Sequence, residues 1–319
     1  MFLQILILIA GLFLVVMGAE WLVDGASSVA RKAGISEFVI GLTIVGFGTS
    51  CPELVVSLTG ALQGSADISV GNVIGSNIFN TLLILGTTAL VTPVAMTAAN
   101  RRMDIPLTLL VSFLLIFCGM SHSLLGIGAA DRLSRVEGIV FLVIMAAYLY
   151  YCFKIGKGAS EGDSEEKVRS TFTSVLLILA GLAGLIAGGQ LFVNSAVNIA
   201  QAAGVSEKFI AITLLAGGTS LPELATCIVA AAKRKDQLAL GNILGSNVMN
   251  ILLILGTSSI VTPLSLAGIN IVDAIALLAS MVLIWVFAYT GKRDKIDRWE
   301  GGILLLAYLA YMIFLFKKL

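Results

Sequence analysis

The sequence contains few charged residues. Asp, Glu, Lys and Arg make up 12% of the 319 residues, whereas they form about a quarter of an ordinary soluble domain. Hydrophobic residues make up 58%, and the mean hydropathy is +1.01. Because no soluble fold can bury so much apolar surface, the composition predicts a protein that resides in the lipid bilayer. In a membrane protein the formal net charge of +1 carries no information about nucleic acid, and no nucleic-acid partner is expected.

Histidine and paired cysteines are also scarce. The chain has one histidine, His122, and four cysteines, none of which lies in a C-x-x-C pair. Imidazole and thiolate ligands for a transition metal are therefore lacking, and we expect the cysteines to be free apolar side chains. We find no nucleophile–base pair, nucleotide-binding loop or metal-hydrolase motif, so neither an enzyme nor a cofactor is expected.

Long apolar segments dominate the chain. A helix needs about 20 apolar residues to cross the roughly 30 Å hydrocarbon core of a bilayer. The N-terminal segment lacks a basic region and a cleavage site, so it is interpreted as a spanning helix and not as a signal peptide. The sequence predicts an all-α membrane protein with ten transmembrane helices, near residues 3–24, 37–61, 69–93, 104–121, 134–153, 172–194, 207–231, 239–263, 270–290 and 299–316.

A polar stretch rich in Gly, Ser and Glu divides the ten spans into two sets of five. We therefore expect a first five-helix repeat over 1–153, a linker over 154–170 and a second five-helix repeat over 171–319. If both termini lie outside, most Lys and Arg residues fall in inner loops, as the positive-inside rule requires. This predicts a multi-pass protein of the cell (inner or plasma) membrane with a cytoplasmic linker, and we expect it to function as a monomer.

The chain matches itself when it is shifted by 170 residues. GTSCPEL (48–54) matches GTSLPEL (218–224), and GNVIGSNIFN (71–80) matches GNILGSNVMN (241–250). Because each half has an odd number of spans, the halves enter the membrane from opposite sides, an arrangement typical of secondary transporters. A repeat kept only for packing would explain matching apolar residues. It would not explain matching Thr, Ser, Glu and Asn inside spans, where polar groups are costly.

Each half also carries a proline in the middle of a span, Pro52 and Pro222. Relative to Ala, proline destabilises a helix by about 3 kcal/mol, and it leaves the carbonyl four residues earlier without a donor. In lipid such a carbonyl must bond to protein, water or an ion. A single proline would indicate a simple kink, but two at matching positions, each directly before a glutamate, favour broken helices that hold a cation.

The two glutamates, Glu53 and Glu223, are the most informative residues. An unpaired charge in mid-span costs at least about 2.5 kcal/mol, and no Lys or Arg lies at a similar depth in the sequence. The counter-charge must then be dissolved cations or protons, and an inverted repeat would bring both glutamates to one site. Ca²⁺ prefers about six to eight oxygen ligands. Hydroxyl groups next to the glutamates can supply some of them: Thr49, Ser50, Thr219 and Ser220.

The second matching motif adds polar residues on two further helices. Its glycines are spaced to allow close helix approach. For Asn77 and Asn247, hydrogen bonding between helices and contact with an ion both remain open. The residues expected to face the glutamates are Ser76, Asn80, Ser246 and Asn250.

Together these motifs resemble the two α-repeats of the Ca²⁺/cation antiporter superfamily, most closely those of the prokaryotic Na⁺/Ca²⁺ exchangers. The resemblance covers nearly the whole chain. It implies a ten-helix fold with four ion sites in a central diamond, and first and sixth helices that slide as a gate. By position, it implies a Ca²⁺ site formed by Glu53 and Glu223 with the backbone carbonyls of Thr49 and Thr219. It further implies Na⁺ sites that use Ser50 with Ser76, Ser220 with Ser246, and the carbonyls of Gly46 and Ala216, with Asn80 and Asn250 completing the middle.

The resemblance also implies a function, the exchange of three Na⁺ for one Ca²⁺ by alternating access, which would move net charge. K⁺-dependent members carry Asp at the position of Asn250, so we expect K⁺-independent exchange here. Cys51 lies beside the expected site and predicts sensitivity to thiol reagents. Two alternatives stay open: a Ca²⁺/H⁺ antiporter on the same scaffold, and a cation channel.

Overall fold

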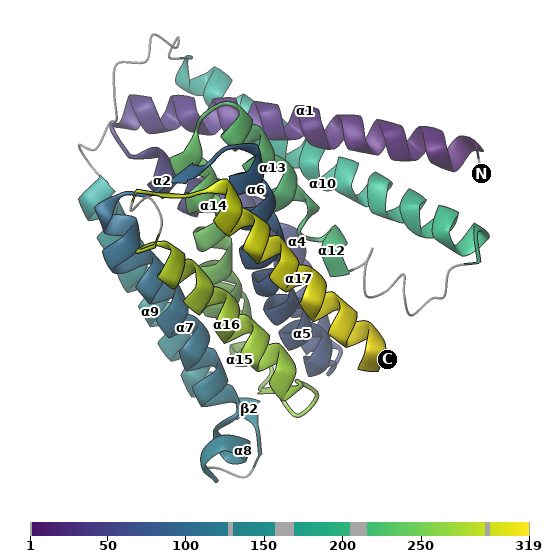
Figure 1. The fold of residues 1–319 in the computed structure, drawn as a ribbon, viewed down its shortest axis with the longest axis vertical. Helices are drawn as coiled ribbons and strands as arrows, with labels where there is room; N and C mark the ends of the chain where they lie inside the picture. The colour runs from purple at the N-terminus through teal and green to yellow at the C-terminus, as the bar shows by residue number, and fades with distance from the viewer. Residues whose placement is uncertain (1, 127–129, 157–168, 205–215, 291–293, 319) are drawn as a thin grey trace.

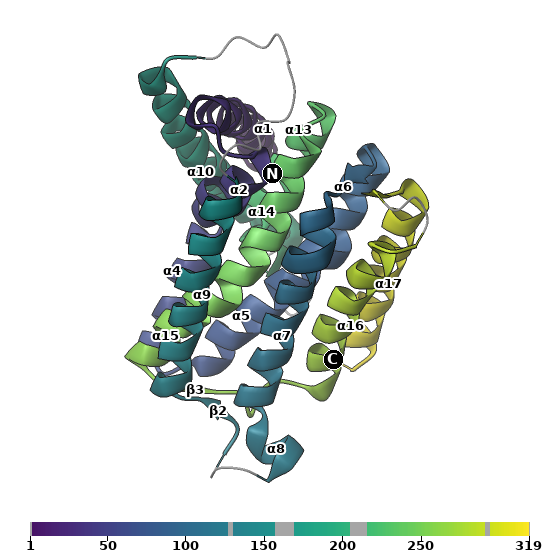
Figure 2. The same cartoon turned by 90° about the vertical axis from the view of Figure 1, so that its left-hand side faces the viewer.

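The computed structural model describes residues 2–126, 130–156, 169–204, 216–290 and 294–318, and nearly all of this chain is helical (Figures 1 and 2). Within these ranges, seven helical runs are long and apolar enough to cross a membrane, or eight if the bent run 37–62 is one span. Two shorter apolar helices accompany them, α13 (Leu221–Ala232) and α16 (Ile271–Phe287). A helical membrane protein is therefore confirmed, whereas ten crossings stay a prediction.

The helices of the first half alternate between α-helical and π-helical segments. They are α1 (Phe2–Ala33), α2 (Glu37–Ile40), η1 (Gly41–Val45), α3 (Gly46–Thr49), α4 (Cys51–Leu62), α5 (Ala66–Ile78), η2 (Phe79–Ile84), α6 (Leu85–Val91), η3 (Asn100–Asp104), α7 (Ile105–Gly119), α8 (Ser121–Leu125) and α9 (Arg135–Gly156). The described helices of the second half, besides α13 and α16, are α10 (Thr171–Ala202), α12 (Ala216–Gly218), α14 (Asp236–Met249), η5 (Asn250–Leu255), α15 (Gly256–Val261) and α17 (Arg298–Lys318).

Two parts of the sequence prediction lie partly outside the described residues. Residues 157–168, most of the expected linker, lie outside the described ranges. The start of the expected seventh span, up to residue 215, lies outside them as well. Where both halves are described, their helices match. The segments from α13 to α15 start within one residue of the positions 170 residues after those from α4 to α6.

The first and sixth expected spans, α1 and α10, lie side by side and cross the ends of the other helices (Figures 1 and 2). They run antiparallel, because Gly11 packs on Gly188 while Gly25 packs on Ser174. The backbones touch, and a Cβ added at Gly18 would lie 2.7 Å from a backbone nitrogen of α10. Small residues in both helices permit this approach.

These two helices are longer than the sequence predicted. α1 was expected to end near residue 24 and α10 near residue 194, but they end at Ala33 and Ala202. The added turns of α1 consist largely of small residues that are buried in the fold, including Gly25, Ala26 and Ser27. Hydropathy indicates how much of a helix is apolar enough for lipid, and it does not report where the helix itself ends.

The described ranges also include four two-residue strands, which the sequence did not predict. β1 (Val94–Ala95) pairs with β4 (Lys295–Ile296), and β2 (Arg132–Leu133) pairs with β3 (Leu264–Ser265), both antiparallel. Each pair joins the first half of the chain to the second. β1 and β3 follow a Thr-Pro step that ends the preceding helix in extended backbone, since the residue before proline avoids the helical region.

The two predicted breaks are present, in the turn that precedes each proline. α3 ends at Thr49 and α4 begins at Cys51, with a bend of 50° between the two arms of the run 37–62. Pro52 occupies the first turn of α4, where its missing N–H has no helical partner to lose. The second half repeats this arrangement between α12 and α13.

Candidate ion-binding site

Glu53 and Glu223 lie in the first turns of α4 and α13, directly after the helix breaks. Each side chain is only 1% exposed. The Ser50 hydroxyl donates to Glu223 Oε1 over 3.1 Å, and the Ser220 hydroxyl donates to Glu53 Oε1 over 3.0 Å. Each carboxylate is therefore held by a serine from the opposite half, near the partial positive charge at the start of its own helix.

No fixed positive charge balances these carboxylates in the described part of the chain. The ion pairs found there involve other acids, for example Asp24 with Lys233 and Arg169, and none includes either glutamate. Oε2 of both Glu53 and Glu223 is buried without a hydrogen-bond partner. Because a buried, unpaired charge costs several kcal/mol, the site requires cations or protons from solution.

Other buried oxygens in the paired motifs also lack partners. Since buried polar atoms normally find a hydrogen bond, such atoms mark a place where a ligand can bind. Beyond the two carboxylates, the unpartnered oxygens of these motifs are Thr219 Oγ1, Asn80 Oδ1, Asn247 Oδ1 and Asn250 Oδ1. All are oxygens, so together they offer the hard donor set that Ca²⁺ and Na⁺ prefer.

The remaining predicted hydroxyl groups lie in the same buried network. The Ser220 hydroxyl is 3.3 Å from Ser76 Oγ, which links the second helix break to α5. Ser246, on α14, donates to the side chain of Asn242 over 3.4 Å. Ser76 and Ser246 are at most 1% exposed. The fold thus brings hydroxyl groups of both motifs from both halves into contact with the glutamates or their neighbours.

Backbone carbonyls at the first break differ in their availability. Hydrogen bonds across the break end on the carbonyls of Gly46 and Ser50, each at 3.0 Å. Pro52 has no N–H to offer to Gly48, and no described bond across the break ends on Thr49. The carbonyl of Thr49 is therefore better placed for an ion than that of Gly46. The counterpart of Gly46 in the second half is Ala216, the first residue of α12. The segment before Ala216 lies outside the described residues.

Asn80 and Asn250 lie in the π-helical segments η2 and η5. Single π-helical turns interrupt the regular hydrogen-bond pattern and are frequent at functional sites. Asn250 donates to Asn77 Oδ1 over 2.9 Å, and Asn77 in turn donates to the backbone of Asn247 over 3.1 Å. Both ends of the Asn77 amide are thus used between helices, which favours the packing interpretation for this residue.

Sequence reasoning missed two asparagines, Asn72 and Asn242. Asn242 is fully buried and accepts from the Thr49 hydroxyl over 3.2 Å as well as from Ser246. Asn72 donates to Ser57 Oγ over 3.0 Å and approaches the Glu53 carbonyl. The available signal was the repeat itself, because both residues follow the first glycine of the matching motif in each half.

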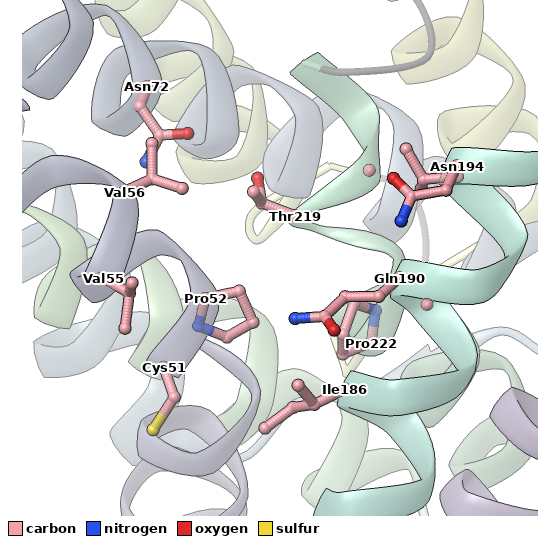
Figure 3. Close-up of a pocket in the computed structure, with 13 residues that line it drawn as sticks. Cys51, Pro52, Val55, Val56, Asn72, Ile186, Gln190, Asn194, Thr219 and Pro222 are labelled. Atoms are coloured by element: carbon pink, nitrogen blue, oxygen red, sulfur yellow. The ribbon is translucent and has the colours of Figure 1, made fainter. Parts of the chain in front are cut away.

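A cavity of about 480 Å³ reaches this site from one side (Figure 3). Its walls come from α4, α5, α10 and the second helix break, and Pro52, Pro222 and Thr219 lie where these elements meet (Figure 3). Gln190 and Asn194 of α10 line it as well. The cavity thus extends along α10 to residues directly next to the buried carboxylates, Pro52 and Pro222.

The donor set selects the class of ion. Among the described residues, no group of three or more His, Cys, Asp or Glu side chains could hold a metal. The site instead combines two carboxylates with hydroxyl, amide and carbonyl oxygens, which suits Ca²⁺ or Na⁺ and not a transition metal.

Comparison with known proteins gives matches over the whole chain. The sequence profile described as sodium/calcium exchanger protein matches residues 3–154 and 173–317. The putative antiporter CaxA of Alkalimonas amylolytica is 39% identical over 326 residues, covering 97% of this chain and 98% of CaxA. The sodium/calcium exchanger MaX1 of Methanosarcina acetivorans is 31% identical over 345 residues, covering 98% of both. The structure of the sodium-calcium exchanger NCX_Mj soaked with 10 mM Na⁺ and zero Ca²⁺ is 33% identical, covers 98% of both chains and superposes with a TM-score of 0.84.

Proposed function

The chain belongs to the sodium/calcium exchanger protein family, and on that premise we propose that it moves Ca²⁺ across a membrane in exchange for Na⁺. The family consists of transporters, and its members are not enzymes. Relatives named as an antiporter and as a sodium/calcium exchanger match over their whole length, which supports the same activity for this multi-pass membrane protein.

One observation carries the proposal. Glu53 and Glu223 come from opposite halves, each bonded by the other half's serine, and neither has a basic partner among the described residues. Two negative charges balance one Ca²⁺. When three Na⁺ replace it, as the family resemblance implies, one extra positive charge crosses the membrane. We therefore expect exchange to be electrogenic.

Alternating access between two inverted five-helix repeats is the proposed mechanism. The matching helix bounds, the strand pairs that join the halves and the antiparallel pair of α1 and α10 all support it. With both termini outside, the cavity beside Gln190 and Asn194 opens outward. The site would then be open to the outside and closed to the cytoplasm.

Na⁺ coupling without K⁺ is the finer part of the proposal. Asn250 contributes an amide where a third carboxylate would raise the negative charge of the site. The buried hydroxyl and amide oxygens give Na⁺ ligands that protons do not need. The rival, Ca²⁺/H⁺ exchange, uses the same carboxylates and differs only in the ion that replaces Ca²⁺.

Transport by the purified protein in lipid vesicles tests these points. We expect vesicles loaded with Na⁺ to accumulate Ca²⁺. An inside-positive potential should speed this uptake, because one net positive charge leaves the vesicle in each cycle, and K⁺ should not change the rate of uptake. If a pH gradient drives equal Ca²⁺ uptake without Na⁺, the protein is a Ca²⁺/H⁺ antiporter. Ca²⁺ flux that needs no counter-ion would indicate a channel.

A further inference from the structure

The two halves treat one pair of matching residues differently. In the second half of the site, Asn242 Oδ1 lies 3.2 Å from the Thr49 hydroxyl and 3.4 Å from that of Ser246. The residues that correspond to these after a shift of 170 are Asn72, Thr219 and Ser76.

On the other side this contact is absent within the described residues. Thr219 Oγ1 is buried and has no hydrogen-bond partner. Ser76 is bonded by Ser220 instead. Asn72 and Thr219 both line the 480 Å³ cavity, and the side-chain oxygen of Asn72 points toward the side where Thr219 lies (Figure 3). The open side of the site therefore lacks the bond that is made on the closed side.

One other bond of each asparagine does correspond. Asn72 donates to Ser57 Oγ over 3.0 Å, and Asn242 donates to Cys227 Sγ over 3.3 Å, where Cys227 occupies the position equivalent to Ser57. Each amide nitrogen is thus anchored on its own half in the same way. Asn72 also donates weakly to the Glu53 carbonyl over 3.4 Å, a contact within its own half. The contact with the opposite half is made by the amide oxygen, and this is the contact that differs between the two sides.

We infer that Asn72 and Asn242 are positioning residues of the exchange cycle, each holding the threonine of the opposite half only while its own side of the site is closed. The inference rests on the proposed alternating access. In this structure Asn242 holds Thr49 and both side chains are fully buried, whereas Thr219 lacks this bond where the cavity is open. The bond ties the threonine at one helix break to the opposite half, so closure of that side and the arrangement of the ion site are coupled.

The expected size of the effect is moderate. A hydrogen bond between uncharged groups changes a two-state equilibrium by about fivefold. The Thr49 hydroxyl also has the Val45 carbonyl within reach, at 3.1 Å, so its single proton is shared and fivefold is an upper value. Each asparagine therefore biases the balance between open states without abolishing binding.

Cys51 lies in the wall of this cavity, and the second cavity that it borders, of about 530 Å³, is lined almost entirely by apolar side chains. A hydrophilic reagent therefore reports the state of the first cavity. We would use purified protein with Cys118→Ala, Cys152→Ala and Cys227→Ser, the last of which reproduces the Ser57 anchor. The rate of Cys51 modification by a hydrophilic thiol reagent is measured at the Ca²⁺ concentration that protects half of the protein.

Opposite shifts are expected from the two matching variants. Asn72→Leu should destabilise the closed cavity and speed modification by up to about fivefold, whereas Asn242→Leu should destabilise closure of the other side and slow it by a similar factor. Thr49→Val should reproduce Asn242→Leu, and the double variant should add nothing further. Ser57→Ala is the matched control, because it removes an Asn72 contact without touching Thr219, and it should shift the rate in neither direction.

Shifts in the same direction for both asparagines, or no shift for either, would overturn the inference. If one leucine variant fails to fold, Thr49→Val and Thr219→Val remove the same two bonds from the other partner and decide in its place. Because modification is measured without transport, this failure is distinct from failure of the proposed function, which would appear as wild-type protein that does not exchange Na⁺ for Ca²⁺.

Discussion

Neutralising one of the two buried glutamates is the most informative single change. Glu53→Gln keeps the size of the side chain and an oxygen that can accept from Ser220, now at 3.0 Å from Oε1. It removes one of the two negative charges that balance a divalent ion. The fold should therefore survive while the chemistry of the site changes.

The expected magnitude follows from burial. Glu53 is 1% exposed and its second oxygen has no protein partner, so a bound ion would be the direct partner of that charge. Removing one member of a buried ion pair costs about 3–5 kcal/mol, which weakens Ca²⁺ binding by about a hundredfold to a few thousandfold. The loss for Na⁺ should be about half as large in kcal/mol, because its charge is half that of Ca²⁺.

Two measurements would check this expectation. Ca²⁺ uptake into Na⁺-loaded vesicles should fall to background, and calorimetric titration should give the loss of affinity. Without cations, thermal stability should rise, since the variant no longer buries two like charges near each other. Glu300→Gln is the matched control, because this glutamate is also fully buried but is bonded by Thr290 and the Asp297 N–H outside the site. Ca²⁺ affinity within tenfold of wild type for Glu53→Gln would refute the reasoning.

Four further changes are expected to give distinct results. Asn250→Asp loses the donor to Asn77 and adds a third carboxyl group, so uptake should become more sensitive to acid in a pH series. A thiol reagent should block uptake through Cys51 in the cavity wall, and Cys51→Ala should be resistant; equal block of both would contradict the placement. Asp24→Asn removes the 2.6 Å pair with Lys233, whose side chain is 32% exposed, so apparent Ca²⁺ affinity should shift by less than about fivefold. Gly18→Val would force a side chain against the α10 backbone, and unfolding of the detergent-solubilised protein should occur at lower temperature; unchanged stability would argue against the close helix contact.

The glutamates and their hydroxyl neighbours could be predicted because they are polar residues within segments that are otherwise apolar enough to cross a membrane. A charge in mid-span is costly, and its repetition with Thr, Ser and Pro at a fixed offset leaves few structural explanations. The structure places Ser50 and Ser220 on the carboxylates of the opposite halves. Their roles as ion ligands follow from the family resemblance and stay predictions.

Contacts between the halves could not be predicted in detail. Asn242 accepts from Thr49, which lies on another helix in the opposite half, and no spacing along the chain encodes that contact. The sequence did predict a loosened turn between Gly46 and Pro52, though not the residue at which the helix breaks. The break lies at Ser50, because proline in the first turn of α4 has no helical hydrogen bond to lose. The short strands could not be predicted either, because each pairs with a strand from the other half of the chain.

The length of α1 shows a different limit. Its last turns contain small residues and end in Arg31 and Lys32, so their hydropathy is low. Burial against neighbouring helices nevertheless keeps them helical. Hydropathy therefore underestimated the length of the helix that packs along α10.

The central claim is that two carboxylates from opposite halves share one cation. A crystal structure of the purified protein soaked in Ca²⁺, with the ion located by its anomalous scattering, tests this most directly. We expect one Ca²⁺ bound jointly by Glu53 and Glu223, with further ligands from the helix breaks. Ca²⁺ bound elsewhere, or carboxylates that stay in contact with the serines and bind no ion at saturating Ca²⁺, would contradict the account.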